Sequence, residues 1–220
     1  MKKIIFAATA ALAVASAGEI FADGEGGDSA AYEGDSLGGI FFGAGGGYAF
    51  CSKDTAKSLG TGHEVSKSND RFMGTIIFGS GKSMSAYRIY LGGEVLVDFA
   101  KTKRADQKLD GVDVKMRNNG IAPSLGFRIG IPGSAACTLF FLRGGVTYAK
   151  SMLEYTDWKL TNAKFAPFFG FGAEKMFGGK ISLRGDLEYR CENNKSNDTY
   201  KLVRGHTVNS RVLVVYHVKY

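Results

Sequence analysis

Long hydrophobic runs are missing from this chain of 220 residues. No apolar stretch reaches the length of about 18 residues that a membrane-spanning helix requires, so any crossing of a membrane must be made by strands. Proline is scarce, with 3 residues against 31 glycines, which favours close-packed sheet over disorder. The three cysteines, Cys51, Cys137 and Cys191, match no zinc-binding spacing. We therefore expect neither a metal nor another cofactor.

The odd number of cysteines leaves at least one thiol outside any internal disulfide. Strand parity places Cys51 and Cys191 near the same rim of the predicted sheet, but on opposite faces and with a strand between them. Whether these two residues form a disulfide stays open at this point.

Residues 1–17 have the features of a cleaved export signal. Lys2 and Lys3 give a positive start, residues 4–15 form an apolar stretch too short to span a membrane, and Ala15-Ser16-Ala17 supplies the small residues of a cleavage site. An exported chain does not routinely meet nucleic acid. Without Lys2 and Lys3 the exported chain has a net charge of +5, from 26 basic and 21 acidic residues, which indicates basic rims that face anionic lipid head groups; no nucleic-acid partner is expected.

The segment that follows the signal is acidic. Residues 18–37 contain six acidic residues and no basic one, among many Gly, Ser and Ala residues. This composition predicts a solvated, flexible N-terminal segment. Residues 38–220 then form the folded domain.

The last stretch, Val208 to Tyr220, alternates with a period of two residues. Its even positions read Val, Ser, Val, Val, Tyr, Val and Tyr, while polar residues such as Asn209 and Arg211 occupy odd positions. This period predicts a strand with one apolar face, and about 9–11 residues suffice for a tilted strand to cross a bilayer.

Seven earlier segments repeat this alternation. The predicted strands run from Gly39 to Cys51, Arg71 to Gly79, Tyr87 to Lys101, Gly120 to Ile131, Thr138 to Lys150, Lys164 to Met176, Ile181 to Glu192 and Val208 to Tyr220. Short links, at 80–83, 132–134 and 178–179, alternate with long polar links at 52–70, 102–119, 151–163 and 193–205. This pattern predicts an all-β fold: an eight-stranded antiparallel up-and-down transmembrane β-barrel with short periplasmic turns, longer extracellular loops and both termini in the periplasm.

A soluble eight-stranded carrier is the alternative, because its strands alternate too. Eight strands enclose room only for side chains, so the chemistry of the two faces decides between the two folds. The apolar faces here carry large aromatic residues and almost no charge, whereas the opposite faces are rich in Gly, Ser and charged residues. Bulky apolar side chains suit lipid and small or charged ones suit a narrow lumen, which favours the membrane barrel.

Aromatic residues on the apolar faces gather near the ends of the predicted strands. Outer-membrane barrels carry girdles of this kind at both membrane interfaces. The predicted outer girdle consists of Tyr48, Phe50, Phe99, Tyr148, Phe165 and Tyr189, and the inner one of Tyr87, Phe140 and Tyr220.

Three motifs carry a resemblance to a known family: Phe42 to Tyr48 (FGAGGGY), Pro167 to Gly172 (PFFGFG) and Leu183 to Tyr189 (LRGDLEY). With them, residues 38–220 resemble the eight-stranded outer-membrane barrels of Gram-negative bacteria. That family includes the membrane domain of outer membrane protein A, the small X-type barrels and the opacity-type surface proteins. The resemblance implies that the terminal aromatic residue, Tyr220, is the assembly signal read by the barrel-assembly machinery. These motifs specify a fold and leave the function open.

Charged residues on the opposite faces are expected to point into the lumen. They are Arg88, Glu94, Asp98, Arg128, Arg143, Glu174, Arg184, Asp186, Glu188, Arg190 and Arg211. An unpaired charge is costly in a narrow interior, so we interpret this set as a ladder of ion pairs that fills the barrel. The alternative is a gated path for ions or small solutes through the same charges, which would make the protein a small porin-like channel.

An enzyme is a weaker alternative. Some outer-membrane barrels modify lipids or cleave proteins with a His–Ser or His–Asp pair at the outer rim. Only His206 with Ser210 invites the comparison, and four residues along one strand separate them by roughly 13 Å, too far for proton transfer. We expect no enzymatic activity.

The long links are the other place where function could reside. Binding in such scaffolds is carried by loops on a rigid wall, so outer-membrane lipid, lipopolysaccharide phosphates and host surface ligands are the expected partners. The sequence thus predicts a structural or surface role in envelope integrity or adhesion, or as a surface antigen.

Overall fold

The computed structural model describes residues 38–50, 53–68, 70–84, 87–100, 104–109, 111–118, 120–133, 138–154, 159–177, 179–191, 195–196, 200–204 and 206–218. The predicted export signal, the acidic segment 18–37 and the terminal Tyr220 lie outside these residues, and the expectations about them stay predictions. Within the described residues, no helix has the length and apolar character needed to cross a membrane.

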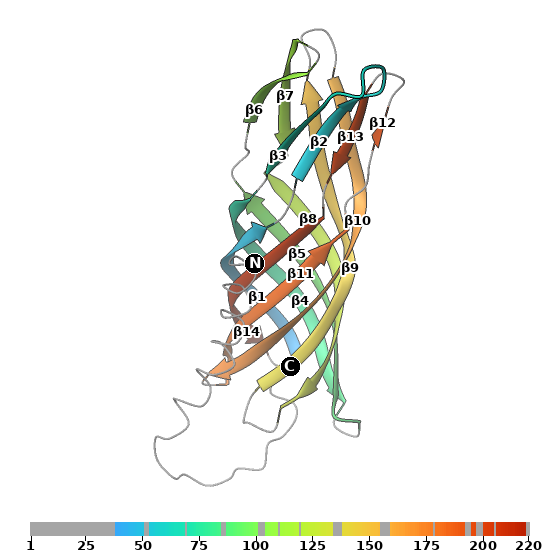
Figure 1. Cartoon of the computed structure of the whole chain (residues 1–220). Helices are drawn as coiled ribbons and strands as arrows, with labels where there is room; N and C mark the ends of the chain where they lie inside the picture. The colour runs from blue at the N-terminus through green and yellow to red at the C-terminus, as the bar shows by residue number, and fades with distance from the viewer. Residues whose placement is uncertain are drawn as a thin grey trace.

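Eight antiparallel strands form a closed barrel (Figure 1). They are β1 (Gly39–Phe50), β4 (Arg71–Met84), β5 (Ile89–Ala100), β8 (Ile121–Pro132), β9 (Thr138–Glu154), β10 (Lys159–Phe177), β11 (Ile181–Arg190) and β14 (Thr207–Val218). Each strand pairs with the next one in this order, and β14 pairs with β1 to close the ring. The up-and-down topology and the strand count are as predicted, because each strand carries its own two-residue alternation.

The two ends of the barrel differ. At one end, short links join β4 to β5, β8 to β9 and β10 to β11. The first barrel strand, β1, begins at this end, and the last, β14, ends there. We call this the short-turn end. At the other, the long-link end, the chain continues well beyond the barrel wall (Figure 1).

The predicted turn at Ser80, Gly81 and Ser83 is wrong, because β4 continues through these residues to Met84. Gly81 is needed for packing and not for a turn. A Cβ atom at Gly81 would overlap the Oη and Cζ atoms of Tyr90 on β5. Only glycine therefore lets the buried Tyr90 ring lie against the backbone of β4.

The long links were predicted as loops, and this prediction is wrong for most of their length. Residues beyond the barrel form β2 (Lys53–Ser58), β3 (Glu64–Ser68), β12 (Lys195–Ser196) and β13 (Tyr200–Arg204), which make a four-stranded sheet in the order β12-β13-β2-β3. β6 (Arg104–Leu109) and β7 (Val112–Asn118) form a hairpin that pairs with the extended end of β9. The interpretation as loops missed that these polar segments pair with one another, which single-segment periodicity does not reveal.

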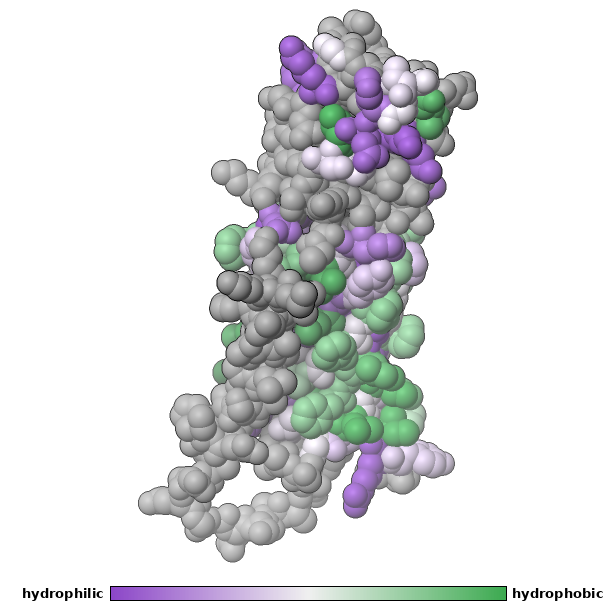
Figure 2. Space-filling model, in the orientation of Figure 1, coloured by the Kyte–Doolittle hydropathy of each residue, from purple (hydrophilic) through white to green (hydrophobic). Residues whose placement is uncertain are grey.

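The outer wall is apolar. The large side chains at outward positions of the barrel strands are exposed, and those exposed by 60% or more are Phe72, Leu125, Phe127, Ile131, Leu142, Phe165 and Phe169. In Figure 2 hydrophobic residues gather over the lower wall, and hydrophilic residues gather at the upper, long-link end. An apolar wall of this kind would be unfavourable in water and suits the hydrocarbon of a bilayer.

Tyr220 lies outside the described residues and Tyr87 lies in the turn before β5, whereas the other predicted girdle residues are on barrel strands, near the strand ends. Phe165 contacts Tyr148 at a ring-centroid distance of 5.6 Å, and Tyr189 contacts Phe169 at 5.2 Å. Phe99, Tyr87 and Phe140 are exposed. Phe50 is only 6% exposed and packs on Tyr48 at 4.8 Å, so it does not present its ring to lipid as expected.

The interior is less uniformly polar than the sequence suggested. Two buried apolar clusters lie inside the barrel, next to the charged residues. One consists of Phe41, Ile77, Leu96, Leu213 and Val215, and the other of Tyr90, Leu139, Phe141 and Met176. The inward side chains therefore fill the lumen with both apolar and ionic contacts, as the small cross-section of eight strands requires.

We expect the protein to show heat-modifiable migration. All edges of the eight barrel strands are paired, so opening the wall requires many hydrogen bonds to break together. Unheated protein in sodium dodecyl sulfate should run faster on a gel than boiled protein. Equal migration of both samples, with no β-sheet signal in circular dichroism of the unheated one, would contradict a closed barrel.

Candidate functional site

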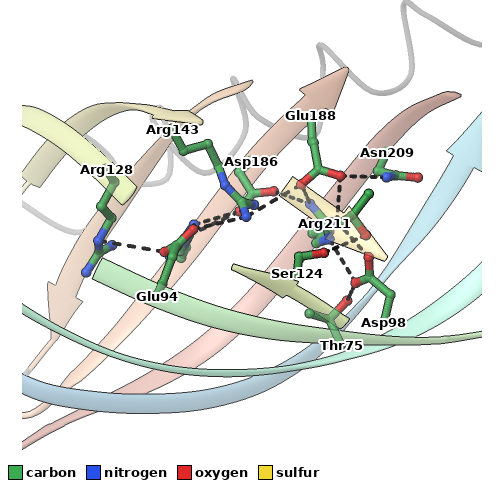
Figure 3. Close-up of polar contacts among 12 residues, drawn as sticks. Thr75, Glu94, Asp98, Ser124, Arg128, Arg143, Asp186, Glu188, Asn209 and Arg211 are labelled. Carbon is green, nitrogen blue, oxygen red and sulfur yellow. Dashed lines mark hydrogen bonds and ion pairs between the residues drawn. The ribbon is translucent and has the colours of Figure 1, made fainter. Parts of the chain in front are cut away.

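The candidate site is the charged network in the lumen, which six strands build from their inward positions. β11 contributes four successive inward residues, Arg184, Asp186, Glu188 and Arg190, because side chains on one face of a strand recur every second residue. Its neighbours β10 and β14, and the strands β5, β8 and β9 further round the ring, contribute the remaining charges. Figure 3 shows members of this network from β5, β8, β9, β11 and β14 pointing toward one another across the lumen.

Arg211 on β14 is the centre of the layer nearest the long-link end. Its guanidinium donates to Asp98 at 2.8 Å, to Glu188 at 3.1 Å and to Asp186 at 3.1 Å. Arg190 also bridges Glu188, at 2.6 Å, and Asp98, at 3.0 Å. Three carboxylates from β5 and β11 are thereby held together by two arginines.

Neutral side chains complete the bonding of this layer. The Thr75 hydroxyl donates to Asp98 at 2.8 Å, and the Asn209 amide donates to Glu188 at 2.9 Å. Because each carboxylate oxygen can accept more than one hydrogen bond, these additional donors lower the cost of burying the charge.

Glu94 on β5 is the centre of the middle layer. Arg184 donates to both of its carboxylate oxygens, at 2.7 and 3.2 Å, in a bidentate pair. Arg143 lies 3.0 Å from Glu94 and 3.2 Å from Asp186. Asp186 accepts from the Nε of Arg184 at 3.1 Å as well, so this layer is joined to the one above through Asp186.

Glu174 on β10 anchors the layer nearest the short-turn end. Arg128 donates to it at 2.6 Å and also to the Tyr90 hydroxyl at 2.7 Å. The Ser182 hydroxyl donates to Glu174 at 2.6 Å, and the Nε2 atom of His217 lies 2.8 Å from the same carboxylate. All of these groups are buried.

Aromatic rings cover three of the guanidinium groups. The Arg128 guanidinium lies 4.3 Å from the Phe41 ring centroid and 4.8 Å from that of Tyr90. Arg143 lies 4.9 Å from Phe168, and Arg184 lies 4.6 Å from Phe141. Such contacts stabilise a desolvated cation through the electron-rich face of the ring.

The charges in the network balance. Among the described residues, the buried acids are Glu94, Asp98, Glu174, Asp186 and Glu188, and the buried arginines are Arg128, Arg143, Arg184, Arg190 and Arg211. The side chains in these ion pairs are at most 6% exposed. Five carboxylates facing five guanidinium groups give a lumen with no excess charge from these residues.

Arg128 and Arg143 are directly opposite each other on β8 and β9, an arrangement that by itself is repulsive. Glu94 relieves the repulsion, because it lies 3.9 Å from Arg128 and 3.0 Å from Arg143. Three nitrogen atoms of these two arginines still make no hydrogen bond within the described residues. This is the part of the network with the least complete bonding.

The structure brings ten of the eleven predicted lumen residues into this network, and Arg88 is the exception. Arg88 lies in the turn before β5, is exposed, and has a φ of 50°. The prediction started the strand two residues too early at Tyr87. The true first inward side chain is Tyr90, which carries a hydroxyl in place of the charge.

Sequence reasoning missed the neutral members of the network and the aromatic rings around it. Tyr90, Ser182 and Asn209 share the inward parity of the charged residues on their strands, and Thr75 lies on the buried, inward face of β4. Parity was therefore a usable signal for these residues, whereas charge alone does not distinguish them from the rest of the chain.

Ser182, His217 and Glu174 include the residue types of a catalytic triad, but not its geometry. The Nε2 atom of His217 faces both Ser182, at 3.0 Å, and Glu174, at 2.8 Å. A triad requires the carboxylate on Nδ1, so that Nε2 is free to accept the serine proton. The Nδ1 atom has no partner within the described residues, and all three side chains are fully buried from solvent.

The other candidates from the sequence find no catalytic partner within the described residues. The exposed His206 stacks on Tyr189 with ring centroids 5.4 Å apart. No three His, Cys, Asp or Glu side chains in the described part of the chain are placed to hold a metal ion. Cys191 is a free cysteine, and Cys51, its suggested disulfide partner, lies outside the described residues.

An apolar outer wall around a filled, ionic interior defines the class of protein to which this fold belongs. It is the reverse of a soluble carrier, and it is the arrangement of an eight-stranded β-barrel of the outer-membrane type. Solved structures agree with this fold. The outer membrane protein OprG from Pseudomonas aeruginosa superimposes with a TM-score of 0.54 at 13% identity, over 82% of this chain and 98% of that chain.

Two further structures are similar over most of their length. The Neisserial surface protein A has a TM-score of 0.49 at 10% identity, covering 81% of this chain and 97% of that chain. The outer membrane protease OmpT from Escherichia coli has a TM-score of 0.47 at 8% identity, covering 81% of this chain and 96% of that chain. No family model matches the sequence, and no curated protein matches it either. The likeness is therefore one of fold.

Proposed function

We propose that this protein is a non-enzymatic outer-membrane β-barrel of a Gram-negative bacterium with a structural or surface role, and that its lumen is closed. Envelope integrity, adhesion and display as a surface antigen are the roles that such a barrel serves. Its expected partners are outer-membrane lipid, lipopolysaccharide and host surface ligands. The barrel-assembly machinery is expected to read the terminal Tyr220.

One observation carries the proposal: five carboxylates and five guanidinium groups fill the lumen in a continuous, buried network. A conducting pore needs space for water and ions along its axis. Here Arg211 and Arg184 reach carboxylates on facing strands, so the charges neutralise one another and occupy that space.

The short-turn end is assigned to the periplasm and the long-link end to the cell surface. In outer-membrane barrels the periplasmic turns are short and the extracellular connections are long. The sheet of β12, β13, β2 and β3 and the β6–β7 hairpin then extend the barrel outward, with hydrophilic residues on them (Figure 2). Paired strands present a more defined surface to a ligand than unpaired loops do, which supports a role in surface recognition.

The reconstituted protein is expected to conduct weakly or not at all in planar bilayers. The paired charges leave no open path, and separating a buried pair exposes each partner to a large desolvation cost. Single-channel recording of the purified protein checks this. Steady, large conductance from the unmodified protein would overturn the closed-lumen proposal in favour of a porin-like channel.

A strain that lacks the protein provides the second half of the test. A structural or surface role predicts envelope leakage or reduced adhesion to host cells, and the defect in adhesion should be reproduced by deleting the β6–β7 hairpin while the barrel is kept. A mutant with intact envelope and adhesion, but with reduced uptake of small solutes, would contradict the proposal.

A further inference from the structure

The apolar wall has a hollow near the short-turn end, between β4, β5 and β8. It is a shallow, open depression of about 430 Å³, and its lining includes Ser80, Lys82, Leu91, Gly93, Phe127 and Arg128. Ser80 pairs with Gly93, and Gly93 with Phe127, so small residues on two adjacent strands lie next to an exposed ring. A Cβ atom at Gly93 would meet no atom within 4 Å, which shows that the space above Gly93 is open.

The hollow is bounded by large apolar side chains and by one exposed ammonium group. Leu91 and Phe127 are 40% and 62% exposed, and Lys82 is exposed beside them. Lys82 pairs across the strands with Leu91 and lies two residues before the end of β4 at Met84. The residues that line the hollow include no acid. A cation at the end of an apolar wall can extend its charged group toward lipid head groups.

We propose that this hollow, which we call the Lys82 hollow, binds one anionic phospholipid of the membrane leaflet at the short-turn end. The inference rests on the proposed membrane location. The Lys82 ammonium pairs with the lipid phosphate, and an acyl chain lies over Gly93 between Leu91 and Phe127.

A phospholipid fits the hollow better than a second copy of the chain. A stable protein interface buries about 1,200–2,000 Å² and needs complementary surface on both partners. The space over Gly93 is instead a single depression of about 430 Å³ with a cation at its edge. An anionic lipid supplies both an apolar chain and a negative head group, which match the two parts of this site.

Native mass spectrometry of the full chain, folded in detergent with defined phospholipid, tests the proposal. The probes are phosphatidylglycerol and phosphatidylcholine of equal chain length. The unmodified protein should retain one phosphatidylglycerol in about fivefold preference to phosphatidylcholine, since one lysine near an anionic head group contributes about that factor. Lys82→Met should bring this preference close to one, because methionine keeps the apolar stem and removes the charge.

Gly93→Leu puts an apolar side chain into the hollow, where its Cβ atom would meet no atom within 4 Å, and it should abolish retention of both lipids. Gly74→Leu is the matched control, because Gly74 is also exposed on the wall and lies toward the long-link end, and a Cβ atom added there would be 3.9 Å from its nearest neighbour. This variant should retain lipid normally. Equal preference in Lys82→Met and the unmodified protein, or normal retention by Gly93→Leu, would overturn the proposal.

Three other outcomes can be distinguished from one another. A dimer that Gly93→Leu dissociates would show that a second copy occupies the hollow, and it would overturn the lipid site. Failure of the unmodified protein to insert into bilayers would contradict the proposed membrane function itself. Normal insertion without any selective lipid retention would contradict the Lys82 hollow alone.

Discussion

Replacing Glu188 by alanine is expected to reduce the free energy of unfolding by about 3–5 kcal/mol, the usual cost of removing one partner from a buried ion pair. Glu188 accepts hydrogen bonds from Arg190, Arg211 and Asn209, and it is fully buried. Its loss leaves two buried guanidinium groups with fewer acceptors and gives the lumen an excess positive charge. Equilibrium unfolding in urea, from lipid vesicles, measures the change.

Asp113→Ala is the matched control for Glu188→Ala. Asp113 is an exposed acid on β7, outside the lumen, so its removal should change the free energy of unfolding by no more than about 0.5 kcal/mol. Glu188→Ala should also increase ion leakage in planar bilayers, whereas Asp113→Ala should not. Equal effects of the two variants on stability would mean that the lumen network contributes no more than a surface charge.

Replacing Gly81 by alanine is expected to cost about 1–3 kcal/mol, the typical penalty for overpacking a filled interior. The added methyl group would overlap the Tyr90 side chain and approach the Leu91 carbonyl at 3.0 Å. Tyr90 has little freedom to move, because Arg128 donates to its hydroxyl at 2.7 Å and lies 4.8 Å from its ring. The same urea unfolding assay measures the loss.

Two variants distinguish this steric effect from a general intolerance of side chains in the wall. Gly93→Ala, at a position with no atom within 4 Å of the new Cβ, should leave stability within about 0.5 kcal/mol of the unmodified protein. Tyr90→Phe removes the hydroxyl that alanine at position 81 would meet, so the double variant should lose less than the sum of the two single changes. Strict additivity would show that Gly81 and Tyr90 do not compete for space.

The alternation along each segment was sufficient to predict the barrel strands and their inward faces. On β11, the residues Arg184, Asp186, Glu188 and Arg190 alternate with Leu183, Leu187 and Tyr189, so a one-residue shift would expose every charge to lipid. Because of that penalty, the sequence of a single wall strand is enough to predict which of its residues point into the barrel. The same argument gave nothing for the polar segments of the long links, because neither of their faces is apolar.

The sequence could not predict which of the charged residues form ion pairs with one another. Arg184 and Glu94 are separated by 90 residues, and Arg211 and Asp98 by 113. Their distance depends on the tilt and stagger of strands around the closed ring, which individual segments do not encode. The burial of Phe50 and the exclusion of Arg88 depend in the same way on packing at the strand ends.

The sequence by itself determined that the barrel has eight strands, each with an apolar face outside and a polar or charged face inside. It could do so because the two-residue alternation is a property of each segment alone. Only the tertiary structure decided that five acids meet five arginines in one network, that Gly81 makes room for Tyr90, and that the long links pair into strands. The physical reason is that these features depend on distances between strands, and closure of the barrel sets those distances.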